Sequence, residues 1–142
     1  MSVDSRQHAP MRDFVIAGPV VAILTLLLCQ FVHMAIIEDR LHHAAQAAAQ
    51  EATLPRATSE SISAAAQRVL RQTRLHDVTD LPIVTINGQS NLLYPLDLIE
   101  SGDHVEVTLG AYAADVMPNA LSAIGLSLSG RKLRATASFT KR

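Results

Sequence analysis

The sequence predicts an α+β protein. A long N-terminal transmembrane helix continues into a small domain with one amphipathic helix and an antiparallel sheet of about three to four strands. Three observations support this prediction. Residues 14–37 form a run of 24 residues without Asp, Glu, Lys or Arg. Residues 60–74 repeat apolar side chains at helical spacing, and beyond Pro82 the apolar period changes to two, which is typical of half-buried strands.

The apolar run is long enough to be a membrane anchor. As a helix it would extend about 36 Å, against a hydrocarbon core of about 30 Å. Secretory signals have shorter apolar regions, of about 7 to 15 residues, followed by a small-residue cleavage site that is poorly matched here. A lipidated Cys29 is also disfavoured, because Leu28 stands where lipoprotein signals carry a small residue. A retained anchor is the favoured interpretation, and a cleaved signal and a lipoprotein are the alternatives.

The flanking charges predict the orientation. Arg6 and Arg12 precede the run and Arg40 follows it, which favours a cytoplasmic N-terminus. The chain is therefore divided into a cytoplasmic tail or leader, a transmembrane helix, an Ala-rich helix extension and an extracytoplasmic α+β domain. These segments are residues 1–13, 14–37, 38–53 and 54–142.

The helix is expected to continue beyond the membrane, because alanine favours helix and no Gly or Pro occurs between Arg40 and Pro55. Its end is expected near Thr53. A face of small side chains follows helical spacing in the extension: Leu41, Ala44, Ala45, Ala48, Ala49 and Ala52. Such a face permits close packing, either against other helices or against the chain's own domain.

The remaining elements follow from local signals. Thr58 or Ser59 is expected to cap the amphipathic helix of residues 60–74. Strands are predicted at residues 83–86, 104–109 and 133–140, and Asn87-Gly88 indicates a two-residue hairpin turn after the first.

The connection at residues 111–129 is unusual because it is mostly apolar. We interpret it as a cap over the core, with a short helix after Pro118. The alternative is a membrane-surface or partner-binding patch.

No residue pattern predicts an enzyme, a cofactor, a metal site or a small-molecule substrate. The formal net charge is −1, so a nucleic-acid partner has no electrostatic basis. The only cysteine, Cys29, excludes an internal disulfide. His42 and His43 are consecutive, so on a helix they point about 100° apart and cannot chelate one ion together.

Several residues of the long helix are candidates for contacts between subunits. Asp13 stands at the start of the apolar run, where it can complement the helix dipole or pair with the terminal amine of a neighbouring subunit. Pro19 removes a backbone donor, which can kink a membrane helix. Gln30 and His33 are one turn apart, and polar groups at depth favour contact with another helix, although His33 can also reach the interface.

The chain resembles the TadE-like family, pilin-like membrane subunits of the tight-adherence (Tad) pilus machinery. Asp13-Phe14 followed by Pro19 matches the family's acidic residue, Phe and early proline, with Asp where Glu is usual. Gln30-Phe31, eleven residues past the proline, stands where the family often has Glu-Phe. An Ala-rich continuation, a Gly102-Asp103 turn before a Val/Thr strand, and a final strand ending in basic residues are also similar.

This resemblance implies a structural minor pilin or pseudopilin-like subunit of the bacterial inner membrane, with a periplasmic or extracellular domain that can be incorporated in a pilus. Its partners would be the lipid bilayer, other pilin-like subunits and the pilus assembly platform. The residues expected to pack helices are Asp13, Phe14, Pro19, Gln30, Phe31, Ala45 and Ala48.

One departure from the family concerns processing. Pilin-like precursors are cut after a glycine that would correspond to His8, and residues 1–13 contain no glycine. The missing glycine disfavours cleavage by a prepilin peptidase, and a cleaved leader and an uncleaved anchor both stay open as alternatives. Two alternatives remain from the residues alone: a single-pass anchor that binds a partner in another envelope complex, and a secreted or lipidated binding domain.

Overall fold

A single long helix organises the molecule. The structure, a computed structural model, describes residues 9–73, 75, 77–90, 99–117, 122, 125, 127 and 130–141. Helix α1 (Ala9–Ala52) has 44 residues and passes through Pro19 without interruption. At 1.5 Å per residue it is about 66 Å long. It ends at Ala52, close to the predicted end, because Pro55 disfavours helical backbone at the residue before it.

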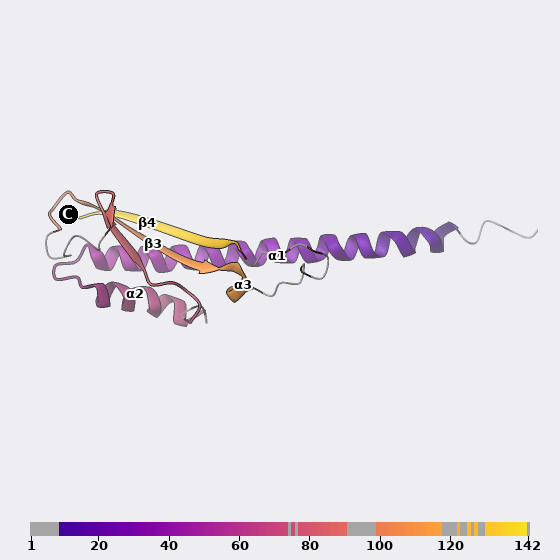
Figure 1. Ribbon diagram of the computed structural model, residues 1–142, viewed down its shortest axis with the longest axis horizontal. Helices are drawn as coiled ribbons and strands as arrows, with labels where there is room; N and C mark the ends of the chain where they lie inside the picture. Colours follow the sequence, from indigo (N-terminus) through magenta and orange to yellow (C-terminus); the bar gives the residue numbers. More distant parts are fainter. Residues whose placement is uncertain are drawn as a thin grey trace, which may run out of the picture.

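The other elements surround only the C-terminal half of α1 (Figure 1). Helix α2 lies on one side of this half, and a sheet lies on the other, with β3 and β4 against α1. The chain order after α1 is α2 (Ser59–Arg71), β1 (Ile83–Ile86), β2 (Gln89–Ser90), β3 (His104–Tyr112), α3 (Ala113–Val116) and β4 (Lys132–Thr140). The result is an α+β domain of three layers with α1 in the middle.

The face of small side chains on α1 forms the centre of this domain. Its members are 0 to 1% exposed: Leu41, Ala44, Ala45, Ala48, Ala49 and Ala52. Because α2 and the sheet approach α1 from two sides, they cover a wide part of its circumference. Larger side chains on this part of α1 would hold the layers apart. Ile62, Ala66 and Leu70 of α2 complete one side of the core. The predicted face is therefore buried within the chain's own domain.

Helix α2 begins at a capping box. Thr58 has an extended backbone, and its Oγ1 accepts a hydrogen bond from the Ser61 backbone N at 3.1 Å, while the Ser61 Oγ accepts one from the Thr58 backbone N at 3.1 Å. This exchange satisfies two donors that the first turn leaves unpaired, and it selects Thr58 over Ser59 as the cap. The helix ends at Arg71, three residues earlier than predicted, where Gln72 becomes the C-cap.

The sheet is antiparallel throughout, in the order β2-β1-β3-β4. The predicted turn between β1 and β2 is confirmed: Asn87 and Gly88 have φ angles of 48° and 82°. Two consecutive positive φ angles are the signature of a type I′ turn, whose twist matches that of the flanking strands. Alternate residues of β3 and β4 face α1 and are buried, among them Val105, Val107 and Leu133.

Strand β3 is longer than predicted, because Ala111 and Tyr112 pair with Leu133 and Lys132 of β4. The apolar connection therefore begins as strand and continues as α3. Ala113 and Met117 are buried and Val116 packs against the core, so the described start of this connection does cap the core. The predicted short helix after Pro118 begins outside the described residues.

A network of hydrogen bonds joins the β1–β2 turn to the turn before β3. Asp103 Oδ1 accepts from Asn87 Nδ2 at 2.7 Å, and Asp103 Oδ2 accepts from the Glu100 backbone N at 2.8 Å. The His104 backbone N donates to Asn87 Oδ1 at 2.9 Å. The pKa of Asp103 is held below its ordinary value. The largest cause is the hydrogen bond from Asn87, followed by the bond from the Glu100 backbone N, and the charge of Lys141 adds to both.

We expect the Asp103 carboxylate to stabilise the fold in a pH-dependent way. Because its pKa is lowered on folding, its contribution is present above the unfolded pKa of about 3.9 and is lost as the pH falls through the folded pKa. The Asp103→Asn variant should therefore lose less stability than the wild type between about pH 6 and about pH 3. Urea unfolding at both pH values measures this difference. Asp115→Asn, which removes a carboxylate from α3, is the control, and equal pH dependence in wild type and Asp103→Asn would contradict the expectation.

Candidate membrane-spanning and assembly helix

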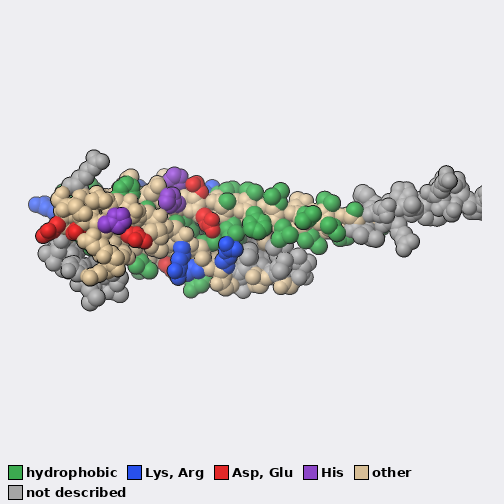
Figure 2. Space-filling view, turned by 90° about the horizontal axis from the view of Figure 1, so that it is seen from above, with side chains coloured by type: hydrophobic (Ala, Val, Ile, Leu, Met, Phe, Trp, Pro, Cys, Tyr) green, Lys and Arg blue, Asp and Glu red, His purple; other side chains and the backbone are tan. Residues whose placement is uncertain are grey.

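The N-terminal half of α1 exposes large apolar side chains on most of its circumference, whereas Ile23, Leu27 and Gln30, which share one side, are half-buried. The large apolar side chains on the open part are 45 to 69% exposed: Val15, Val20, Val21, Leu24, Leu26, Leu28, Phe31 and Val32. Because successive residues are 100° apart, these positions cover most of the circumference. We call residues 15–33 of α1 the apolar rod. Figure 2 shows apolar side chains along this part of the molecule, which extends from one end of the domain. A helix that is apolar on every side is normally buried, either in a protein core or in a membrane.

The polar residues in this rod are placed in different ways. The Thr25 Oγ1 donates to the Val21 carbonyl oxygen at 2.8 Å, so its hydroxyl hydrogen is satisfied inside the helix. Such bonds are how hydroxyl side chains are accommodated in lipid. Gln30 is half-buried, whereas Cys29 and His33 are exposed. Among the described residues, α1 is one helix that is long and apolar enough to cross a membrane.

The domain begins to cover α1 before the apolar run ends. The first buried side chains are Met34 and Ile37, at 8% and 4% exposure, and Leu41 follows at 0%. The described side chains of residues 15–33 are exposed or half-buried, and at 1.5 Å per residue this stretch extends about 28 Å. This length is close to the thickness of the hydrocarbon core.

The residues predicted to pack helices fall into three groups. Pro19 and Phe31 are exposed on the apolar rod, and Gln30 is half-buried on it. Ala45 and Ala48 are fully buried against the chain's own domain, so they pack α1 within the subunit. Asp13 and Phe14 belong to α1, but their side chains lie outside the described residues.

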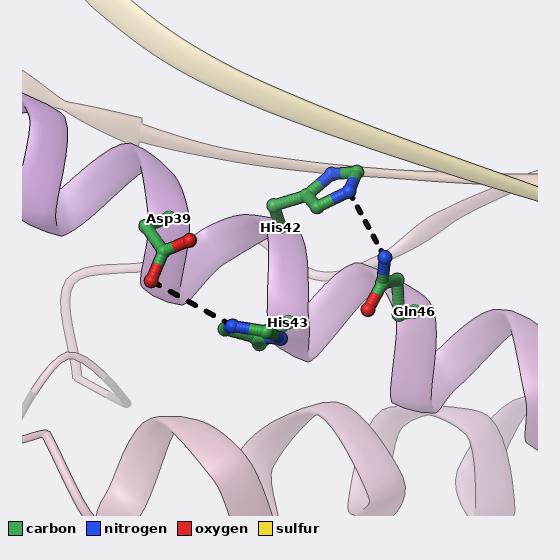
Figure 3. A network of polar contacts seen from close by, with 4 residues as sticks. All are labelled: Asp39, His42, His43 and Gln46. Atoms are coloured by element: carbon green, nitrogen blue, oxygen red, sulfur yellow. Dashed lines mark hydrogen bonds and ion pairs between the residues drawn. The ribbon is translucent and has the colours of Figure 1, made fainter.

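The helix surface beyond the apolar run carries polar pairs that are local to α1 (Figure 3). His43 Nε2 lies 3.6 Å from Asp39 Oδ2, and Gln46 Nε2 lies 3.0 Å from His42 Nε2. The two imidazoles point in different directions, as their sequence positions predict. Within the described residues, no group of three or more His, Cys, Asp or Glu side chains could hold a metal ion.

One cluster was missed from the sequence because its members are far apart in the chain. Asp80 forms an ion pair with Lys132, whose ammonium also lies 5.2 Å from the centre of the Tyr112 ring. The Asp80 backbone N donates to the Gly110 carbonyl oxygen at 2.7 Å. A Cβ on Gly110 would come within 2.7 Å of Lys132 Cε, so this glycine leaves room for the pair. No local sequence signal brings these residues together.

Searches with this chain found no matching family model, no matching curated protein and no matching solved structure.

Proposed function

We propose that the chain is a structural membrane subunit, similar to the TadE-like minor pilins, that assembles through α1 in a Tad-type pilus or a related secretion assembly. The observation that carries the proposal is the double role of this helix. Its N-terminal half exposes apolar side chains on most of its surface, and its C-terminal half is the core of an α+β domain. One rigid element thus joins a membrane anchor to an external domain.

The proposed placement follows from where burial begins. With residues 15–33 in the hydrocarbon core, Met34 marks the exit, and the domain sits directly on the membrane surface. Arg6 and Arg12 favour a cytoplasmic N-terminus, so the domain would be periplasmic or extracellular and the membrane would be the bacterial inner membrane.

The proposed contacts between subunits lie on the apolar rod. Pro19 and Gln30 are eleven residues apart, which is about three helical turns, so they share one side of α1. A glutamine side chain in the membrane favours contact with another helix over contact with lipid. Asp13, at the cytoplasmic end, would pair with a neighbouring subunit. Ala45 and Ala48 are not part of this surface, because the domain covers them.

Photo-crosslinking in native membranes tests the proposal. Phe31 is 60% exposed and adjacent to Gln30, so Phe31→p-benzoylphenylalanine places a reactive group on the rod. We expect adducts in which the second peptide is the membrane helix of another subunit. Asp13→Ala with Gln30→Leu should lower the adduct yield by about fivefold or more, corresponding to roughly 1 kcal/mol of lost helix contact.

Thr25→Val is the matched control, because the Thr25 hydroxyl already bonds its own helix and should not contribute to a contact between subunits. Adducts to lipid alone would contradict the assembly role and leave a single-pass anchor for another envelope complex. Intact mass of the mature protein tests the remaining alternative, since a start near Cys29 or Ile36 would indicate a lipidated or secreted domain.

A further inference from the structure

Strand β4 forms an open edge of the sheet. The strand order β2-β1-β3-β4 places it at one end, and no strand in the described part of the chain pairs with its outer side. Figure 1 shows β4 as the outermost strand, running along α1 in the same direction. With nine residues it is long for an edge, whereas β2 at the opposite edge has only two. An unpaired edge of this length is a template for strand addition.

The outward backbone groups of β4 belong to its even-numbered residues. The Lys141 N donates to the Asp103 O at 3.0 Å, and the Ala113 N donates to the Arg131 O at 2.9 Å, so odd-numbered residues bond β3 at both ends of the strand. Because bonding alternates along an antiparallel ladder, the residues between them alternate as well. The residues whose N–H and C=O face outward are Lys132, Arg134, Thr136, Ser138 and Thr140.

The charge along this edge is uneven. Lys132 and Arg134 stand at the end of β4 nearer the apolar rod, and the three outward residues beyond them are uncharged. Lys132 is already paired with Asp80, whereas no ion pair of Arg134 is found among the described residues. Arg134 is exposed, so it can pair with a carboxylate on a strand laid beside β4.

We propose that the outer edge of β4 binds an extended segment of a different protein chain, antiparallel to β4 and with acidic residues near the C-terminal end of that segment. Antiparallel addition continues the pattern of the sheet and pairs every outward backbone group of β4. Since β4 runs away from the apolar rod, the bound segment runs toward it. Its acidic residues then lie opposite Lys132 and Arg134.

A second copy of the chain fits this edge poorly. Two β4 strands paired antiparallel would point their α1 helices in opposite directions, because β4 and α1 run the same way. Two anchors in one membrane need the same direction. A parallel two-fold pair would instead set identical backbone groups against each other, N–H to N–H. This exclusion rests on the proposed membrane anchoring, whereas the open edge does not.

The test uses the full chain in detergent micelles and two synthetic peptides of one composition. The first is Thr-Val-Thr-Val-Thr-Val-Glu-Val-Glu, which places its glutamates opposite Lys132 and Arg134, and the second has the reverse order. We expect the first peptide to slow hydrogen exchange at the Thr136 and Ser138 amides. The second should bind about two- to fivefold more weakly, as the one new cross-strand charge pair of Arg134 predicts. Arg134→Glu should remove this preference.

Thr136→Pro blocks the edge while leaving the bonds to β3 intact, because the Thr136 N–H faces outward. It should abolish peptide protection, and Thr136→Ala, which keeps the N–H, should bind within about twofold of wild type. Ser138→Pro is the second blocking variant if Thr136→Pro fails to fold, as judged by exchange of the β3 amides. The proposal would be overturned by equal binding to both peptides or by undiminished binding to a folded proline variant. A dimer in detergent that the proline substitution disrupts would also overturn it. None of these readouts depends on subunit crosslinking in the membrane.

Discussion

Replacing Leu24 by arginine is expected to release much of the protein from the membrane. Leu24 lies at the centre of residues 15–33, and its side chain is 59% exposed on the apolar rod. An arginine at the centre of a membrane helix costs about 2.5 to 3.5 kcal/mol, and the favourable contribution of leucine is lost as well. The insertion equilibrium should therefore fall by a factor of about one hundred or more.

The measurement is the fraction of protein that resists extraction by alkaline carbonate. Leu24→Ala is the control, because it shortens the side chain without adding charge. Leu24 is not among the described residues that form the core or pack against it, so neither variant should change the exchange rates of the β3 amides. Full retention of Leu24→Arg in the membrane fraction would show that residues 15–33 do not form the span.

Replacing Leu41 by alanine is expected to destabilise the domain strongly. Leu41 is 0% exposed and is among the largest fully buried side chains of the core. It lies on the part of α1 that α2 and the sheet cover from two sides, so neither layer can close over the vacated space without moving the other. Truncation of such a leucine costs about 2 to 5 kcal/mol, a large share of the roughly 5 to 15 kcal/mol that stabilises a typical domain.

Hydrogen exchange of the β3 amides and of the odd-numbered β4 amides in detergent measures this loss, because these amides are bonded between strands and are protected until the domain unfolds. The matched control is Leu54→Ala, because Leu54 is 50% exposed after the end of α1 and its truncation should change stability by no more than about 0.5 kcal/mol. Similar effects of the two substitutions would mean that the centre of the core lies elsewhere.

Local signals in the sequence were sufficient for most elements. The period of apolar residues located α2 and the strands, Pro55 located the end of α1, and Asn87-Gly88 located the hairpin turn. Where the sequence carries no local signal, the observed boundaries of the elements differ from the predicted ones. Strand β3 extends to Tyr112 because β4 supplies partners for Ala111 and Tyr112, and pairing of this kind depends on a segment about twenty residues away.

The same local signals located only some of the candidate assembly residues on the exposed surface of α1. The exposed positions of Pro19 and Phe31 follow from the length of the apolar run. The alanine face was compatible with two kinds of partner, because a face of small side chains permits close approach by any layer. Its complete burial inside the domain assigns Ala45 and Ala48 to packing within the subunit.

The sequence by itself determined that one helix is apolar enough to cross a membrane, that it continues into an Ala-rich half, and that a small α+β domain follows. These properties depend on residue type and short-range spacing, which the chain carries without folding. Only the tertiary structure decided that the domain covers α1 from Met34 onward, that Asp80 meets Lys132 across Gly110, and that β4 is left with an open edge. Each depends on strand order and on which layers meet, which are contacts between distant residues that no local period encodes.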